Sequence, residues 1–123
     1  MAYATVDDVV LATGTATDED TLALLLMKAD RRVDALLMDA GVSGTPGDAD
    51  LESASVHFTV AALIDRGRLT NERTNSLNLG GDLTIGNNTQ NEIDYHESLA
   101  REAVGRYLAR RRGSRVSVRR VNG

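Results

Sequence analysis

The sequence predicts a mainly α-helical fold: a small four-helix domain with a β-hairpin excursion before the last helix and an extended C-terminal tail. Three observations predict it. Several segments repeat apolar residues with the helical period, a Gly-Gly pair near residue 80 separates two short alternating runs, and alternating valines follow a glycine at position 113. A chain of 123 residues corresponds to one domain and can bury an aliphatic core, here with one Phe and no Trp.

The first two helices are predicted at residues 5–13 and 17–41. Thr5 and Asp8 have the spacing of a capping box. Thr17 is the expected N-cap of the second helix, and Gly41 its terminator. The apolar stripe of this helix is wide enough to predict contacts beyond the core of its own domain. The stripe consists of Leu22, Leu25, Leu26, Ala29, Val33, Leu36 and Leu37, and it is widened by Leu24, Met27 and Met38.

Two further helices are predicted at residues 51–67 and 92–112. Asp50 is the expected cap of the third helix and Gly67 its end. Asn91 is the expected cap of the last helix, and Gly113 its end. Three arginines at 110–112 would lie in the final turn, where cations interact favourably with the helix dipole.

The segment before the last helix predicts a β-hairpin at about residues 76–86. Leu77 and Leu79 alternate with polar residues before the glycine pair, and Leu83 and Ile85 alternate after it. An isolated two-stranded hairpin is barely stable in water. This hairpin therefore predicts support from a neighbouring subunit or a partner.

Charge is strongly segregated along the chain. Residues 1–100 carry six basic and seventeen acidic residues, a formal charge of −11, whereas residues 101–123 carry eight arginines and one glutamate, a formal charge of +7.

The tail after Gly113, "SRVSVRRVNG", predicts an extended strand. Three interpretations compete for it: a solvated end, a nucleic-acid contact, or a strand that pairs with the sheet edge of a partner whose carboxylates meet the arginines. We favour strand pairing and place DNA second.

No set of residues predicts an enzyme. The chain has no cysteine and only two histidines, His57 and His96, so neither a catalytic site nor a metal site is predicted, and no cofactor is expected. The glycines at 80, 81 and 86 lack the Gly-Lys-Ser/Thr of a phosphate-binding loop. The longest strictly apolar run, "LALLLM", is far shorter than the roughly 20 residues of a membrane span, so no membrane partner is expected.

The segment "YATVDDVVLATGTATDEDTLALLLMKADRRVDALL" resembles the opening of head–tail connector (adaptor) proteins of tailed bacterial and archaeal viruses. The residues that carry the resemblance are Thr5, Asp8 and Val9, followed by the helix from Thr17 to Leu37 with the stretch Ala29, Asp30 and Arg31. It covers about the first forty residues; beyond them only the layout is similar.

The resemblance implies a structural virion protein rather than an enzyme. Such a protein would form a ring, typically a dodecamer, that docks on the portal protein, extends the DNA channel and offers the attachment surface for the next neck or tail-completion protein. Genomic DNA would pass through without sequence-specific binding. The location would be the neck of the virion, and the host cytoplasm during assembly. A small nucleic-acid-binding regulator that uses the arginine-rich C-terminus is the alternative.

Two candidate sites follow from this resemblance. Residues 1–113 would be the helical adaptor domain and residues 114–123 the extended docking tail. The portal-binding residues would be Arg115, Val116, Ser117, Val118, Arg119, Arg120 and Val121. The hairpin residues Leu79, Gly80, Gly81, Asp82 and Leu83 would face the ring's lumen or a neighbouring subunit.

Overall fold

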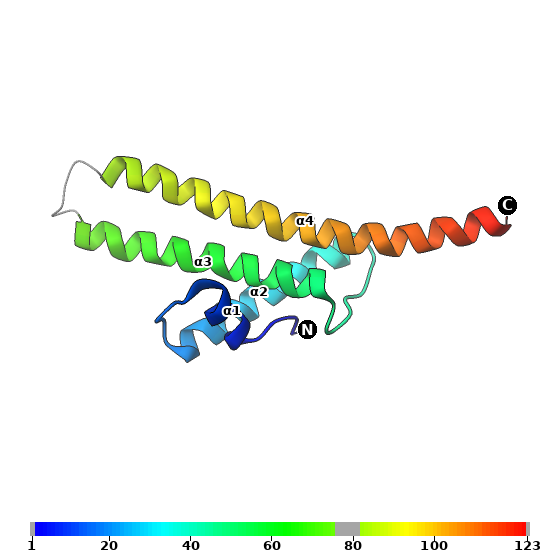
Figure 1. Cartoon of the computed structure of the whole chain (residues 1–123), viewed down its shortest axis with the longest axis horizontal. Helices are drawn as coiled ribbons and strands as arrows, with labels where there is room; N and C mark the ends of the chain where they lie inside the picture. The colour runs from blue at the N-terminus through cyan, green and yellow to red at the C-terminus, as the bar shows by residue number, and fades with distance from the viewer. Residues whose placement is uncertain (1, 76–81, 123) are drawn as a thin grey trace.

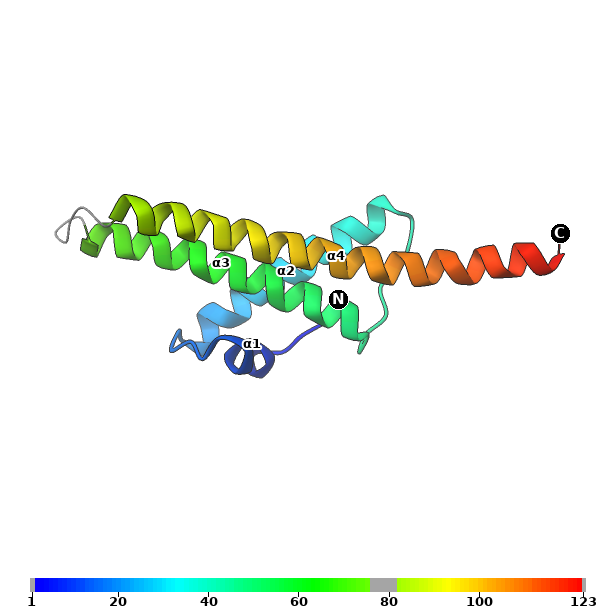
Figure 2. The ribbon, with the colours of Figure 1, turned by 45° about the horizontal axis from the view of Figure 1, so that its top comes forward.

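The computed structural model describes the backbone of residues 2–75 and 82–122 and the side chains of residues 2–67 and 89–111. These residues form four helices: α1 (Val6–Thr13), α2 (Glu19–Asp39), α3 (Ala49–Asn75) and α4 (Asp82–Asn122). The two longest, α3 and α4, lie side by side and share the most extensive contact between any two elements (Figure 1). Helices α1 and α2 pack on one side of this pair, and the C-terminal end of α4 projects beyond it in both views (Figure 2).

Helix α1 confirms the predicted capping box. The backbone N–H of Asp8 donates to Thr5 Oγ1 over 3.2 Å, and the backbone N–H of Thr5 donates to Asp8 Oδ2 over 2.9 Å. The helix ends at Gly14, whose φ of 64° is a left-handed conformation that suits glycine. A short helix is marginal alone, and α1 gains its stability from the burial of Val9 against α2 and α3.

Helix α2 confirms the predicted second helix, with its cap shifted by one residue. Asp18 rather than Thr17 is the N-cap, and it accepts the backbone N–H of Thr21 over 3.0 Å. The hydroxyl of Thr17 instead pairs with that of Thr15 in the preceding loop. Gly41, at φ 70°, turns the chain away after the helix, as predicted.

Helix α3 begins and ends outside the predicted bounds. Asp48, not Asp50, is the cap: its Oδ1 accepts the backbone N–H groups of Asp50 and Leu51 over 2.9 and 3.1 Å. The helix also continues through Gly67 to Asn75. A glycine inside a helix costs only about 1 kcal/mol relative to alanine, and the long contact with α4 offsets a cost of that size.

Helix α4 includes residues from both segments that the sequence predicted to be non-helical, the β-hairpin and the C-terminal tail. Leu83 and Ile85, predicted as a β-strand, lie in the helix, which begins at Asp82; Leu77, Leu79, Gly80 and Gly81 lie outside the described residues. The described ranges, 2–75 and 82–122, contain no strand. Gly113 does not end the helix either, because the backbone stays helical to Asn122 where an extended tail was predicted. Extending an existing helix adds a hydrogen bond per residue without a new nucleation cost, which explains why weak local β-signals do not prevail.

The core combines the aliphatic side chains that the composition predicts with three of the chain's four aromatic residues, Tyr3, Phe58 and Tyr107. Its larger cluster joins α2, α3, α4 and the N-terminal segment around Phe58, which is 2% exposed. A smaller cluster holds α1 against α2. The larger cluster comprises Tyr3, Ala29, Val33, Leu37, Leu51, Ala54, Phe58, Ala100, Ala103, Val104 and Tyr107, and the smaller one Ala4, Val9, Leu22 and Leu26.

The wide stripe of α2 is only partly used by the core. Leu22, Leu26, Ala29, Val33 and Leu37 are buried, whereas the residues that widen the stripe stay exposed. Leu24 and Met27 are about half exposed and Met38 is 78% exposed; on α1, Leu11 is 85% exposed. The described fold thus leaves large apolar side chains of α1 and α2 facing solvent.

Candidate docking site at the end of α4

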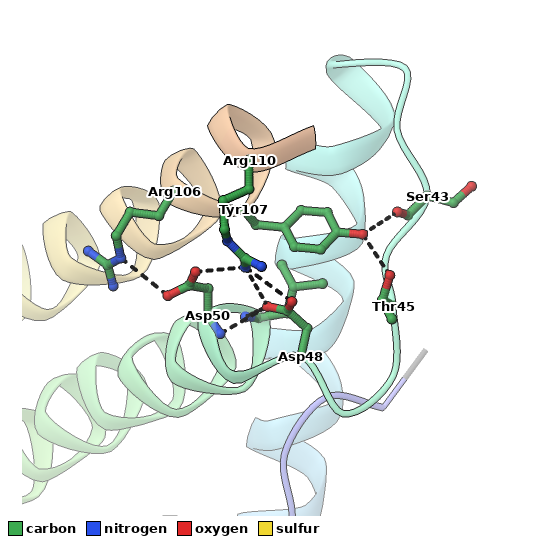
Figure 3. Close-up of polar contacts among 8 residues, drawn as sticks. Ser43, Thr45, Asp48, Asp50, Arg106, Tyr107 and Arg110 are labelled. Atoms are coloured by element: carbon green, nitrogen blue, oxygen red, sulfur yellow. Dashed lines mark hydrogen bonds and ion pairs between the residues drawn. The ribbon is translucent and has the colours of Figure 1, made fainter. Parts of the chain in front are cut away.

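The C-terminal half of α4 is held to the start of α3 by a cluster of charges, which we call the clasp: Asp48, Asp50, Arg106 and Arg110 (Figure 3). Arg110 Nη2 lies 3.1 Å from Asp48 Oδ2 and 2.8 Å from Asp50 Oδ2. Arg106 Nε lies 3.2 Å from the other oxygen of Asp50. The clasp therefore ties the cap of α3 to two successive turns of α4.

A tyrosine on the same part of α4 holds the loop between α2 and α3. The Tyr107 hydroxyl donates to the backbone carbonyl of Ser43 over 2.9 Å and lies 2.8 Å from Thr45 Oγ1 (Figure 3). Its ring is buried, and the guanidinium carbons of Arg110 and Arg111 lie 5.6 and 5.8 Å from the ring centre. Both distances fall within the range of cation–π attraction.

The clasp shifts the pKa values of two of its members, Asp48 and Arg110. Partial burial acts to raise the pKa of the Asp48 carboxyl, but the Leu51 N–H and the Arg110 guanidinium outweigh it, so this pKa lies below its usual value. Hydrogen bonds to Asp48 and Asp50 raise the pKa of Arg110. Charged forms of both partners are thus favoured in the fold.

The predicted docking residues 115–121 all lie in the projecting end of α4, beyond the clasp. Arg115 is five residues past Arg110, so the predicted tail begins little more than one helical turn after the last described contact with α3. These residues are not brought onto the domain surface. They occupy the free end of a helix rather than the extended strand that the valine pattern predicted.

The second predicted site has a different outcome. Asp82 and Leu83 form the first turn of α4, at the end of the molecule opposite the projection (Figure 1). Leu79, Gly80 and Gly81 lie outside the described residues. Asp82 and Leu83 are therefore separated from residues 115–121 by most of the length of α4.

Two polar clusters were not predicted. Asp30, only 7% exposed, accepts hydrogen bonds from the Ser55 hydroxyl over 2.5 Å and from the Tyr3 backbone N–H over 3.3 Å. His57 on α3 and His96 on α4 lie with their Nδ1 atoms 3.0 Å apart. Both pairings join residues at least 25 positions apart, so no local sequence pattern signals them.

Among the described residues, no group of three or more His, Cys, Asp or Glu side chains gathers where a metal ion could bind. None of their helices is both long enough and apolar enough to cross a membrane. Comparisons of the chain with protein-family models, with curated proteins and with solved structures find no match.

Proposed function

We propose that this chain is a structural subunit of a virion neck: a head–tail connector that docks on a portal protein through the projecting end of α4. The observation that carries the proposal is the projection itself, a helix that leaves its domain at the clasp and bears Arg115, Arg119 and Arg120. The resemblance of residues 3–37 to connector proteins points to the same class. A four-helix domain agrees with both.

The mode of docking that we propose is a helix in a groove. An extended strand would need the backbone of residues 114–122 to leave its helical conformation, whereas a helix can enter a partner's groove without that cost. The arginines would meet carboxylates at the groove's rim, since guanidinium groups bind carboxylates with two parallel hydrogen bonds. Copies of the chain would form a ring, typically of twelve, with the channel for genomic DNA at its centre and the next neck protein attached distally.

Removal of residues 114–123 tests the docking. The truncated chain is expected to keep its helical domain, measured by circular dichroism and thermal unfolding, but to lose binding to the portal protein of the same virus in a pull-down. The matched control is Arg101→Gln, an exposed arginine of α4 within the domain, which should bind normally. Normal portal binding by the truncated chain would refute the assignment.

The alternative function, a nucleic-acid-binding regulator, gives the opposite result in a second measurement. It requires that the full chain bind duplex DNA at low salt with an affinity that falls steeply as salt increases. The connector proposal expects no such binding. A tight, salt-sensitive complex of the isolated chain with DNA would favour the regulator, and rings in electron micrographs would favour the connector.

A further inference from the structure

A pair of histidines joins α3 to α4. His57 Nδ1 and His96 Nδ1 lie 3.0 Å apart, with their ring planes inclined by 26° and their centres 5.2 Å apart. Both side chains are half-buried. The two rings come from different helices whose backbones are fixed by buried neighbours, so their nitrogen atoms meet without any rearrangement of the chain.

The separation of the two nitrogens suits a shared metal ion. Metal–nitrogen bonds to histidine are about 2.0–2.1 Å long, so two nitrogens 3.0 Å apart would subtend an angle of about 94° at the metal. That is close to the angle of neighbouring positions in square or octahedral coordination. A tetrahedral ion such as Zn²⁺ would need the nitrogens to be about 3.4 Å apart at the same bond length.

The surroundings leave room for further ligands. A pocket of about 400 Å³ adjoins both imidazoles; His57 and His96 line it together with the hydroxyl-bearing Thr13 and Thr15 and apolar residues of α3. A second hollow shares His57 and is lined by two carboxylates, Asp8 and Glu52. Solvent can therefore reach the pair and supply the remaining ligands.

Metal binding would change which ring nitrogen carries the hydrogen. Without a metal, one Nδ1 carries a hydrogen and the other accepts it. With a metal, that hydrogen moves to Nε2 of the same ring, and each Nδ1 offers a lone pair.

We propose that His57 and His96 form a two-histidine site for a divalent cation of square or octahedral preference, Cu²⁺ or Ni²⁺, with water in the remaining positions. Imidazole is a favoured ligand of both ions, and Cu²⁺ binds such sites most strongly among the first-row divalent metals. The bound ion would link α3 to α4 in addition to their apolar contacts. This site is independent of the docking function proposed above.

The test uses the untagged full chain titrated with NiCl₂ and, separately, CuCl₂. Each ion is expected to bind with a stoichiometry of one per chain and to raise the thermal unfolding temperature, because a ligand that binds only the folded state stabilises it. MgCl₂, a hard cation, should do neither. His57→Asn and His96→Asn should each weaken Ni²⁺ binding by at least about tenfold, since even outer-shell losses cost that much.

A spectroscopic measurement on the wild-type chain tests the site without depending on the folding of a variant. Electron paramagnetic resonance of the wild-type chain with one Cu²⁺ should report two imidazole nitrogens. Undiminished Ni²⁺ binding in both variants, a spectrum with one imidazole, or stabilisation that requires a metal-bridged dimer would each overturn the proposed site.

Discussion

Asp30 is the residue whose chemistry departs furthest from its place in the sequence pattern. It lies in the charged stretch "KADRR" of α2, yet its carboxylate is buried and satisfies two donors, the Ser55 hydroxyl and the Tyr3 backbone N–H. Burial raises its pKa, although the two hydrogen bonds act against this. The carboxylate thus fixes the N-terminal segment on α2 and α3 at the expense of a buried negative charge.

Two substitutions of Asp30 should distinguish the stabilisation that comes from its hydrogen bonds from the destabilisation caused by its buried charge. Asp30→Asn retains an oxygen acceptor and should change the free energy of unfolding at pH 7 by less than about 1 kcal/mol. Asp30→Leu leaves two buried donors without a partner and should lower it by roughly 1–3 kcal/mol per donor. Denaturant unfolding measures both, with the exposed Asp39→Ala as control. Equal losses in the two variants would contradict this account.

The raised pKa of Asp30 also predicts the direction in which the stability of the chain changes with pH. Because the pKa of Asp30 is higher in the folded chain than the ordinary value of 3.8, its contribution to the free energy of unfolding decreases as the pH rises above 3.8 through the folded pKa. Asp30→Asn should remove that decrease. At higher pH the variant should therefore gain stability relative to the wild-type chain.

Among the elements, α3 depends on Asp48 twice, as its N-cap and as a member of the clasp. Asp48→Ala removes both roles and should lower the free energy of unfolding by about 1–2 kcal/mol through loss of the cap alone. Asp48→Asn keeps a capping oxygen but loses the charge that faces Arg110, and should cost less. Because the folded pKa of Asp48 is depressed, its contribution is present above the ordinary Asp pKa of 3.8 and is lost as the pH falls through the folded value.

Unfolding of the two Asp48 variants at pH 7 and pH 3 measures this contribution. The free energy of unfolding of each variant should differ most from that of the wild-type chain at pH 7, and the difference should become smaller at pH 3. A gap between wild-type and Asp48→Asn that widens on acidification would contradict the ion-pair account.

The positions of the helices could be predicted from the sequence better than their ends. The existence of four helices was predictable, because apolar spacing and capping residues are local signals, as Thr5 with Asp8 demonstrates. Their ends were less so: Gly67 and Gly113 were expected to stop helices that continue through them. Alternating valines near residue 116 and leucines near residue 83 predicted strands, but local alternation carries no information about the long helix to which each run is joined.

The contacts of the clasp could not be predicted for a different reason. Asp48 and Asp50 are separated from Arg110 by about sixty residues, and either acid could equally have capped α3. Their pairing depends on the packing of α3 against α4, which brings the start of one beside the far part of the other. The histidine pair has the same origin. Sequence spacing identified the residues of the projecting tail, whereas only the fold reveals what anchors it.

At the scale of the whole molecule, the segregation of charge along the sequence becomes a segregation in space. The basic residues 110–120 lie at and beyond the clasp, on the projecting end of α4, while most of the acids belong to the body formed by α1, α2 and α3 (Figure 1). An elongated molecule with opposite charges at its two parts attracts copies of itself end to body. That attraction acts over about 10 Å at 0.1 M salt and is screened at higher concentration.

Removing the projection should therefore make the chain repel itself. The full chain is expected to have a negative second virial coefficient in light scattering at 20 mM salt that rises toward zero at 0.5 M. Deletion of residues 114–123 takes the formal charge from −4 to −7 and should make the coefficient positive at 20 mM salt. The matched control, Lys28→Gln with Arg31→Gln and Arg101→Gln, reaches the same −7 by changing exposed residues of the body. If the control behaves like the deletion, net charge alone governs self-association; if it stays attractive, the position of the arginines on the projecting end of α4 does.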